Sequence, residues 1–177
     1  MSSLLDALDR LGIRDETIVI WTADHGDQMW EHELFLKFNM REASVHVPLL
    51  ISDPRVGAGV RGELVEHIDL FPTICDLVGA ECADSVQGRS LVPLLGEEPA
   101  PEDWRDAVFS QIGDVQMIRT ETEKLNVYGG EAGEYYNLEE DPKEFYNGIG
   151  DEACAGRVSA LYERLRDWEV AHAPGVD

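Results

Sequence analysis

Residues 17–26 have the sequence TIVIWTADHG and are the stretch that decides the fold. Residues 17–22 are β-branched or apolar without alternation, which is typical of a strand that is covered on both faces. Asp24 and His25 follow directly, and in open parallel sheets ligands bind beyond the carboxyl ends of the strands. Gly26 permits the chain to turn away sharply at that point. The stretch therefore predicts a central strand that ends in two polar side chains.

The sequence around this strand alternates between helical and strand patterns. Leucines at helical spacing predict an amphipathic helix over residues 2–11, and a second apolar run predicts a strand over residues 47–51. A short strand is expected at residues 64–65, and a helix capped by Asp69 is expected to end at Gly79. Alternating helices and apolar strands are typical of an α/β fold with a parallel sheet.

The character of the sequence changes near residue 100. Beyond it, short strand-like runs separated by turn residues favour a small antiparallel sheet formed by residues 107–112, 115–120 and 124–128. Apolar residues recur on one stripe of a last helix, predicted over residues 152–170. We therefore divide the chain into an α/β part, residues 1–105, and a small C-terminal α+β subdomain, residues 106–177.

The α/β part contains too few predicted strands and helices to cover both faces and both edges of the strand at residues 17–22. A strand that is apolar on both faces needs neighbours for its backbone groups and helices above and below it. The chain therefore looks like the latter part of a larger, mostly parallel sheet sandwich. Because apolar sheet surface would then be uncovered, we also expect the chain to self-associate.

The charge of the chain narrows the choice of partners. There are 36 Asp and Glu residues against 14 Lys and Arg residues, giving a formal net charge of -22. Such a field repels phosphate backbones and anionic lipids, so neither nucleic acid nor a membrane is expected as a partner. The sequence shows neither a signal peptide nor an apolar run long enough to span a bilayer. The compartment stays open, with a preference for the cytoplasm.

An acidic protein needs a local cation to handle an anionic substrate. The chain has only three lysines, Lys37, Lys124 and Lys143. Lys37 follows a loop of the length needed to return over the end of the first strand. There the carboxylate of Asp24 and the imidazole of His25 can face one ion, because the backbone leaves the strand at that point. These three side chains are expected to converge on one cavity.

Several motifs resemble, in the same order, those of the sulfatase family within the alkaline-phosphatase superfamily. Residues 22–26 (TADHG) resemble T-[SA]-D-H-G, and residues 30–37 (WEHELFLK) resemble GEHxLxxK. Further matches are residues 46–49 (HVPL), 65–73 (VEHIDLFPT), 87–91 (QGRSL) and 134–142 (EYYNLEEDP). Each motif alone is weak evidence, but together they cover residues 3–168.

The resemblance implies roles for five residues. Asp24 and His25 correspond to the late pair of metal ligands, and Lys37 corresponds to the catalytic lysine that contacts a sulfate oxygen. His32 and His46 match positions that the family often fills with a basic residue, which makes each a candidate for substrate binding. The alternative for each histidine is a hydrogen bond to a nearby backbone carbonyl.

The implied cofactor is a divalent metal, and calcium is the ion that the family most often uses. His25 stands where the family more often has Asn, and imidazole is a poor ligand for so hard an ion. Related phosphonate and phosphate monoesterases carry Asp-His here and accept manganese or zinc. The metal (Ca²⁺, Mn²⁺ or Zn²⁺) and the choice between sulfate and phosphate esters therefore both stay open.

The family's nucleophile is a formylglycine made from Cys or Ser within C-x-[PA]-x-R, and none of Cys75, Cys82 and Cys154 lies in that pattern. The cysteines predict neither a disulfide framework nor a zinc ribbon. We expect the C-terminal portion of a sulfuric ester hydrolase for small-molecule sulfate esters, inactive alone. The alternatives are a phosphonate or phosphate monoester hydrolase of the same superfamily, a truncated non-catalytic product, or a subunit completed by a separate N-terminal half.

Other polar residues are assigned structural roles. Asp69 is expected to cap a helix, and Arg89 is expected to hold a loop. The acidic cluster is expected to form a solvated turn; it consists of Glu139, Glu140, Asp141 and Glu144.

Overall fold

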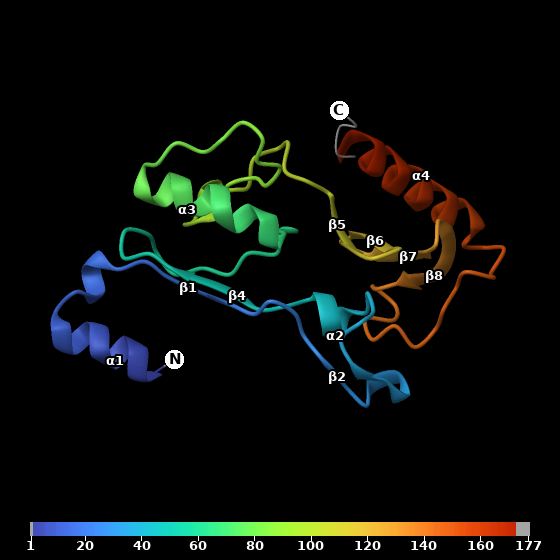
Figure 1. Cartoon of the computed structure of the whole chain (residues 1–177), viewed down its shortest axis with the longest axis horizontal. Helices are drawn as coiled ribbons and strands as arrows, with labels where there is room; N and C mark the ends of the chain where they lie inside the picture. The colour runs from blue at the N-terminus through green and yellow to red at the C-terminus, as the bar shows by residue number, and fades with distance from the viewer. Residues whose placement is uncertain (1, 173–177) are drawn as a thin grey trace. The chain divides into compact units, whose positions relative to one another are not determined.

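The structure is a computed structural model that describes residues 2–172 (Figure 1). The chain forms two compact units, each built from several segments. The first unit comprises Met1–Asp24, Val47–Glu63 and His67–Trp104, and the second comprises His25–His46, Leu64–Glu66 and Arg105–Asp177. The predicted parts, residues 1–105 and 106–177, also contain Met1 and residues 173–177. These six residues lie outside the described residues. The two units are described separately below.

The first unit contains two α-helices, two strands and short 3-10 turns. Its elements are α1 Ser2–Leu11, η1 Arg14–Glu16, β1 Val19–Thr22, β4 Leu49–Ser52, η3 His67–Asp69, α3 Leu70–Val78 and η4 Val92–Leu94. Four elements are therefore present within a few residues of their predicted bounds: the first helix, the helix after Asp69, and the strands predicted at residues 17–22 and 47–51. The helix α3 ends at Gly79, whose φ of 69° is the left-handed conformation that glycine adopts without steric penalty.

The strands β1 and β4 run antiparallel, whereas the alternation of helices and strands predicts a parallel pair. Val19 is opposite Ser52, and Thr22 is opposite Leu49. A parallel connection needs a crossover, usually through a helix of several turns. The chain between these two strands contains a two-stranded hairpin, the 3-10 helix Glu31–Glu33 and the four-residue α-helix Glu42–Val45 (α2), which is too short for such a crossover. Hydrophobic pattern alone does not fix the direction of pairing.

These two strands are also less covered than the sequence predicts. Trp21 on β1 is 42% exposed and Leu50 on β4 is 50% exposed. Large apolar residues such as these are expected to be buried when a sheet is covered on both faces. The fold class is nevertheless confirmed: an α/β part is followed by a small antiparallel sheet and a C-terminal helix.

The second unit is built on a four-stranded antiparallel sheet in the order β5-β6-β7-β8. Its elements are β2 Gln28–Met29, η2 Glu31–Glu33, β3 Phe35–Leu36, α2 Glu42–Val45, β5 Ala107–Ile112, β6 Val115–Thr120, β7 Glu123–Tyr128, β8 Glu131–Asn137 and α4 Ala155–His172. Three of the four strands were predicted as strands, and β8 was not. Gly129 and Gly130 join β7 to β8, and both have positive φ, as two-residue hairpin loops require.

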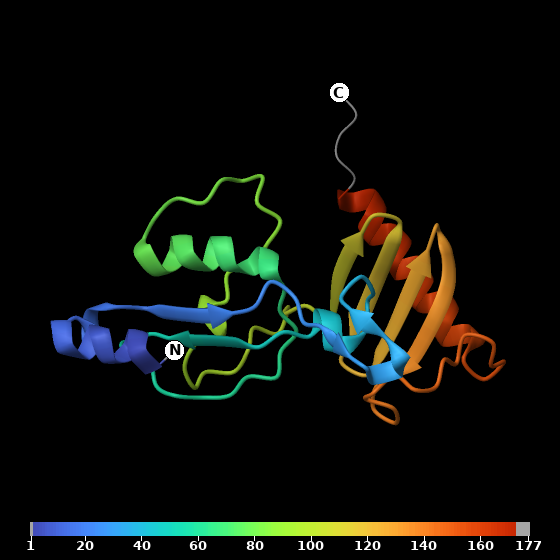
Figure 2. The same cartoon turned by 60° about the horizontal axis from the view of Figure 1, so that its bottom comes forward.

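The helix α4 covers one face of this sheet (Figure 2), and the hydrophobic core of the unit lies on that face. The helix α4 lies across that face, and its residues Leu161 and Leu165 are 3% and 0% exposed. They pack with Ile118, Leu125 and Val127 of the sheet. This helix was predicted from the same apolar stripe. Within residues 2–172, no helix combines the length and the apolar character that a membrane span needs.

The opposite face of the sheet carries buried polar and charged side chains together with Met117 and Tyr136, and it is covered by the segment that carries β2, β3 and α2. Side chains alternate along β7, so Lys124 and Asn126 point away from the face that Leu125 and Val127 occupy. Arg41 and Glu42 of the covering segment form ion pairs with side chains of this sheet. The sheet therefore has an apolar side under α4 and a charged side under residues 25–46.

Residues 64–65 form no strand, in contrast to the prediction. They belong to the second unit, where the next residue, Glu66, lies along the edge strand β5. The Glu66 carboxylate accepts a hydrogen bond from the backbone N–H of Phe109 at 2.7 Å and pairs with Arg105 at 2.8 Å. A side chain rather than a strand thus satisfies the backbone of β5 at this point.

Candidate metal and oxyanion site

The boundary between the two units falls at the Asp24–His25 bond, so the predicted site residues divide between the units. Asp24 ends the first segment of the first unit and is exposed. His25, His32, Lys37 and His46 all belong to the second unit.

His25 and Lys37 are brought into direct contact. The Lys37 ammonium donates a hydrogen bond to Nε2 of His25. Nδ1 of the same ring lies 2.8 Å from the carbonyl oxygen of Gly26, which can only accept, so this nitrogen carries the proton. The imidazole is therefore held as one tautomer, with the Nε2 lone pair directed at a cation. A hydrogen bond from the far ring nitrogen to a backbone carbonyl is the usual arrangement in metal-ligating histidines.

Gly26 fixes the position of His25 against the short helix α2. Its backbone N–H donates to the carbonyl oxygen of Ser44 at 2.8 Å. A Cβ atom at this position would lie 2.0 Å from the carbonyl oxygen of Ala43, so no other residue fits without moving the helix. The glycine of the Asp-His-Gly sequence is required by this close approach of two backbones.

Lys37 is presented by a strained hairpin. The strands β2 and β3 pair Gln28 with Leu36 and Met29 with Phe35. Four residues of this hairpin that are not glycine have positive φ: Trp30, His32, Glu33 and Leu36. Bulky residues in this region of φ are uncommon and often mark functional sites. Trp30, with φ 80°, occupies the place of the glycine in the GEHxLxxK pattern.

The two further histidines have different surroundings. His32 Nδ1 lies 3.4 Å from Nη1 of Arg41, and the His32 ring packs against Phe145 with centroids 4.9 Å apart. His46 is exposed and pairs with the Glu42 carboxylate at 3.2 Å. Both histidines thus contact side chains, whereas the alternative predicts hydrogen bonds to backbone carbonyls. Their role in substrate binding stays a prediction.

A buried group of charges that the sequence reading missed lies beside these residues. Lys124 is 0% exposed, and its ammonium lies 2.5 Å from Glu42, 2.8 Å from Glu144 and 3.0 Å from the carbonyl oxygen of Met40. Glu144, predicted to lie in a solvated turn, is 2% exposed. That prediction is wrong for Glu144, because the carboxylate has a buried cationic partner. A sequence signal existed, since Lys124 is one of only three lysines and lies within a strand pattern.

The electrostatics of this group favour charged carboxylates. Burial raises the pKa of Glu42, but the hydrogen bond with His46 and the nearby Lys124 and Arg119 outweigh it and hold the pKa well below the usual range. Burial also raises the pKa of Glu134, and hydrogen bonds from Asn126 and Tyr128, together with the charge of Arg41, lower it overall.

The first unit places a further imidazole near the end of β1. His67 Nε2 donates to the carbonyl oxygen of Ala23 at 2.8 Å, one residue before Asp24. Sequence reasoning assigned no role to His67, although it lies within the VEHIDLFPT match.

Asp69 occupies the position before α3, but its side chain makes no capping hydrogen bond, so the predicted cap is wrong. The buried carboxylate instead accepts from the backbone N–H of Arg89 at 2.8 Å. The Arg89 guanidinium binds Asp103 at 2.8 and 2.9 Å and stacks over Trp104, with 4.4 Å between Cζ and the ring centroid. Arg89 therefore holds a loop, as predicted.

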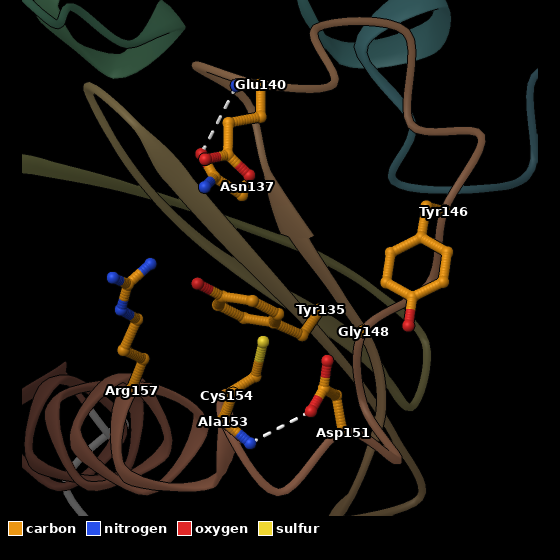
Figure 3. A pocket seen from close by; sticks show the side chains of 9 residues that line it. All are labelled: Tyr135, Asn137, Glu140, Tyr146, Gly148, Asp151, Ala153, Cys154 and Arg157. Carbon is orange, nitrogen blue, oxygen red and sulfur yellow. Dashed lines mark hydrogen bonds between the residues drawn. The ribbon is translucent and has the colours of Figure 1, made fainter.

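A separate pocket of about 290 Å³ lies in the second unit (Figure 3). Its lining consists of Tyr135, Asn137, Glu140, Tyr146, Gly148, Asp151, Ala153, Cys154 and Arg157. None of these is a predicted site residue. The Tyr135 hydroxyl donates to Glu123, and Arg157 pairs with the same carboxylate at 3.7 Å. Burial and this hydrogen bond raise the pKa of Tyr135 to about 12, so the phenol is neutral at ordinary pH.

The described residues do not form a complete metal site. Within residues 2–172, no group of three or more His, Cys, Asp or Glu side chains is arranged to hold an ion. Asp24 and His25 can supply a carboxylate and an imidazole, and further ligands are needed for tight binding of a divalent cation.

Comparison with known proteins identifies the family. Residues 30–171 match the family described as N-sulphoglucosamine sulphohydrolase, C-terminal. The chain is 31% identical to the multifunctional alkaline phosphatase superfamily protein PehA of Trinickia caryophylli, covering 94% of this chain and 37% of that protein.

Two solved structures show the same fold at similar identity. The phosphonate monoester hydrolase SpPMH from Silicibacter pomeroyi gives a TM-score of 0.87 at 28% identity, over 96% of this chain and 38% of that one. A structure solved in complex with its substrate D-glucosamine-2-N,6-O-disulfate gives 0.83 at 30% identity, over 96% and 37%. The chain thus spans little more than a third of the length of these relatives. It belongs to the sulfatase family, of which it represents a C-terminal portion.

Proposed function

We propose that this chain is the C-terminal portion of a sulfuric ester hydrolase and supplies half of a divalent-metal and sulfate site. The observation that carries the proposal is the contact between Lys37 and Nε2 of His25. It sets a cationic side chain beside an imidazole lone pair at the sequence positions where the family resemblance expects a sulfate contact and a metal ligand. The relative that was solved with a disulfated glucosamine supports a sulfate ester of a sugar as the substrate class.

The residues of this chain fit the metal in chemical type. His25 is held with Nδ1 protonated, so Nε2 carries the lone pair that a metal ligand needs, and Lys37, which occupies that lone pair in this structure, would turn to the sulfate; Asp24 would supply a carboxylate. A bound divalent cation would stabilise negative charge on the transferring oxygens. Lys37 would bind a sulfate oxygen by a charge-assisted hydrogen bond. Gly26 and α2 would keep the imidazole oriented during binding.

The chain alone is expected to be inactive. Its 177 residues contain no C-x-[PA]-x-R pattern, so the nucleophile must come from another segment. The number of predicted metal ligands agrees with this expectation, because Asp24 and His25 are only two and the remaining ligands would also have to come from another segment.

A phosphonate or phosphate monoester hydrolase is the second candidate. The observation that favours it is His25 itself, since imidazole suits manganese or zinc better than calcium. The similarity to SpPMH supports the same candidate. A third candidate is a non-catalytic chain or a subunit that is completed by a separate polypeptide.

The coding sequence that precedes the chain provides the first test. If it supplies C-x-[PA]-x-R and an early Asp pair, the extended polypeptide is assayed with p-nitrophenyl sulfate, p-nitrophenyl phosphate and a phenylphosphonate ester. Each assay is repeated in Ca²⁺, Mn²⁺ and Zn²⁺ after chelation. Preference for the sulfate ester supports the first candidate, and preference for either phosphorus ester supports the second. An upstream sequence without these features supports the third.

Two substitutions then test the assigned residues. Lys37→Ala in the active polypeptide is expected to lower kcat by about 10²- to 10³-fold, the usual effect of removing one oxyanion contact. Lys143→Ala, which removes an exposed lysine, is the matched control and should retain full activity. Turnover by the 177-residue chain alone that disappears in Asp24→Ala would refute the expectation of inactivity.

A further inference from the structure

We infer that Glu144 and Lys124 are positioning residues that hold His25 and Lys37 together by fastening residues 25–46 to the polar face of the β5–β8 sheet. The choice of His25 and Lys37 as the residues that matter rests on the proposed function. The fastening itself rests on contacts within the second unit.

Glu144 is the point at which the contacts meet. One carboxylate oxygen accepts from the Lys124 ammonium at 2.8 Å, and the other accepts from the backbone N–H of Glu42 at 2.8 Å. Its backbone carbonyl accepts from Arg41 Nη1 at 2.9 Å. Glu144 thus links Lys124 of β7 to the first turn of α2: one side-chain oxygen binds Lys124, and the other side-chain oxygen and the main-chain carbonyl bind Glu42 and Arg41.

The backbone of Glu144 is strained for this purpose. Its φ is 59°, a conformation that residues with a Cβ adopt only at a cost. The preceding turn places the carboxylate under α2, and the ion pair with a fully buried lysine compensates the strain. Glycine at this position would relieve the strain and lose every side-chain contact.

The charges around α2 are balanced. Three cations, Arg41, Arg119 and Lys124, face three carboxylates, Glu42, Glu134 and Glu144. Lys124 and Glu144 are the buried members of this set, and removing one partner from a buried pair leaves an uncompensated charge, which is strongly destabilising. The set therefore permits one arrangement of α2 on the sheet and resists displacement.

The fastening reaches the site through a short path. Glu42 begins α2, and Ala43 and Ser44 of this helix contact Gly26 closely. Gly26 is bonded to His25, whose ring meets Lys37. Movement of α2 on the sheet would therefore move the backbone that carries His25. We expect the pair to separate when the fastening is lost.

The test compares Glu144→Gln with Glu139→Gln in the full 177-residue chain. Both substitutions remove one negative charge from the same loop, but Glu139 is exposed. Amide hydrogen exchange should rise over residues 25–46 in Glu144→Gln while α4 and β5–β7 keep their protection. The affinity for Mn²⁺, measured by calorimetry, should fall by about 10- to 100-fold, as for partners that orient metal ligands. Glu139→Gln should change neither quantity.

The outcomes separate the two hypotheses. Unchanged exchange over residues 25–46 in Glu144→Gln overturns the positioning role. Raised exchange in a chain whose wild type binds no Mn²⁺ supports the fastening and overturns the expectation that Asp24 and His25 hold the ion without ligands from another segment. Raised exchange with unchanged Mn²⁺ affinity shows that the fastening does not position the ligand, and it also overturns the inference.

A second variant covers the case in which Glu144→Gln fails to fold. Arg41→Lys keeps the positive charge but loses the paired geometry that reaches Glu144 and Glu134. It is expected to raise exchange over residues 25–46 and to weaken Mn²⁺ binding in the same direction. Retained protection and affinity in this variant would count against the inference.

Discussion

The two faces of the β5–β8 sheet are held in different ways. Under α4 the contacts are apolar and non-directional, and Leu165 and Leu125 are both 0% exposed. Under residues 25–46 apolar side chains such as Met117 and Tyr136 are joined by hydrogen bonds and ion pairs, which are centred on Lys124. Apolar packing tolerates small shifts, whereas a buried ion pair loses its compensation when its partners move apart. The face that carries the candidate site residues is thus the face that specifies position more strictly.

Removing the central charge of the polar face is expected to have the largest effect. Lys124→Met keeps the volume but leaves Glu42 and Glu144 without their shared cation. The loss in the free energy of unfolding is expected to be about 3–5 kcal/mol. Urea denaturation measures it, with Lys143→Met, an exposed lysine, as control. A loss below about 1 kcal/mol would show that apolar contacts hold both faces.

Truncation on the apolar face provides the comparison. Leu165→Ala removes a fully buried side chain of α4 and is expected to lower the free energy of unfolding by about 3 kcal/mol through lost transfer energy and the cavity left behind. Val170→Ala, at a position 78% exposed on the same helix, is expected to have little effect. Similar losses in the two variants would contradict the assignment of the core.

The pH dependence should distinguish the faces. Glu42 and Glu134 have a pKa below the usual 4.5 in the folded chain, so their stabilisation is present above pH 4.5 and is lost as the pH falls through the lower values. The stability difference between wild type and Lys124→Met should therefore shrink below pH 4.5. The difference between wild type and Leu165→Ala should stay nearly constant. Thermal melts between pH 7 and pH 3 test this, and parallel curves for all three proteins would refute it.

The smallest expected effect concerns the hairpin that presents Lys37. Trp30→Gly relieves a left-handed backbone and should raise the free energy of unfolding by about 1 kcal/mol. Trp30→Ala removes the same exposed ring without relieving the backbone and should not be stabilising. The difference between the two variants isolates the strain from the lost ring contact with Phe35. Equal stability of the two variants would rule out strain at this residue.

The sequence pattern within each segment was sufficient to predict most strands of the small sheet and the last helix. The turn residues and apolar runs of residues 107–128 predicted β5, β6 and β7, and the stripe through Leu161 and Leu165 predicted α4. The antiparallel pairing of β1 with β4 could not be predicted from the sequence of the two strands, because the same residues can pair in either direction.

The parts of the candidate site that could be predicted are those whose residues lie close together in the sequence. His25 and Lys37 are in contact, and a strand end, a glycine and a loop length constrain both; their convergence with Asp24 on one cavity stays a prediction. Glu144 was misassigned because its partner Lys124 lies 20 residues away and its burial depends on the folded arrangement of both. Asp69 fits a capping pattern, yet its carboxylate serves Arg89, which no local pattern indicates.

The position of Glu66 has a consequence for the outer edge of the small sheet. An edge strand presents unpaired N–H and C=O groups that can recruit a strand from another molecule. At Phe109 the edge N–H is already occupied by a carboxylate, which is itself paired with Arg105. A second chain that approached β5 would have to displace a charged group to extend the ladder. The carboxylate therefore disfavours intermolecular β-pairing, and with it fibril growth, at this edge.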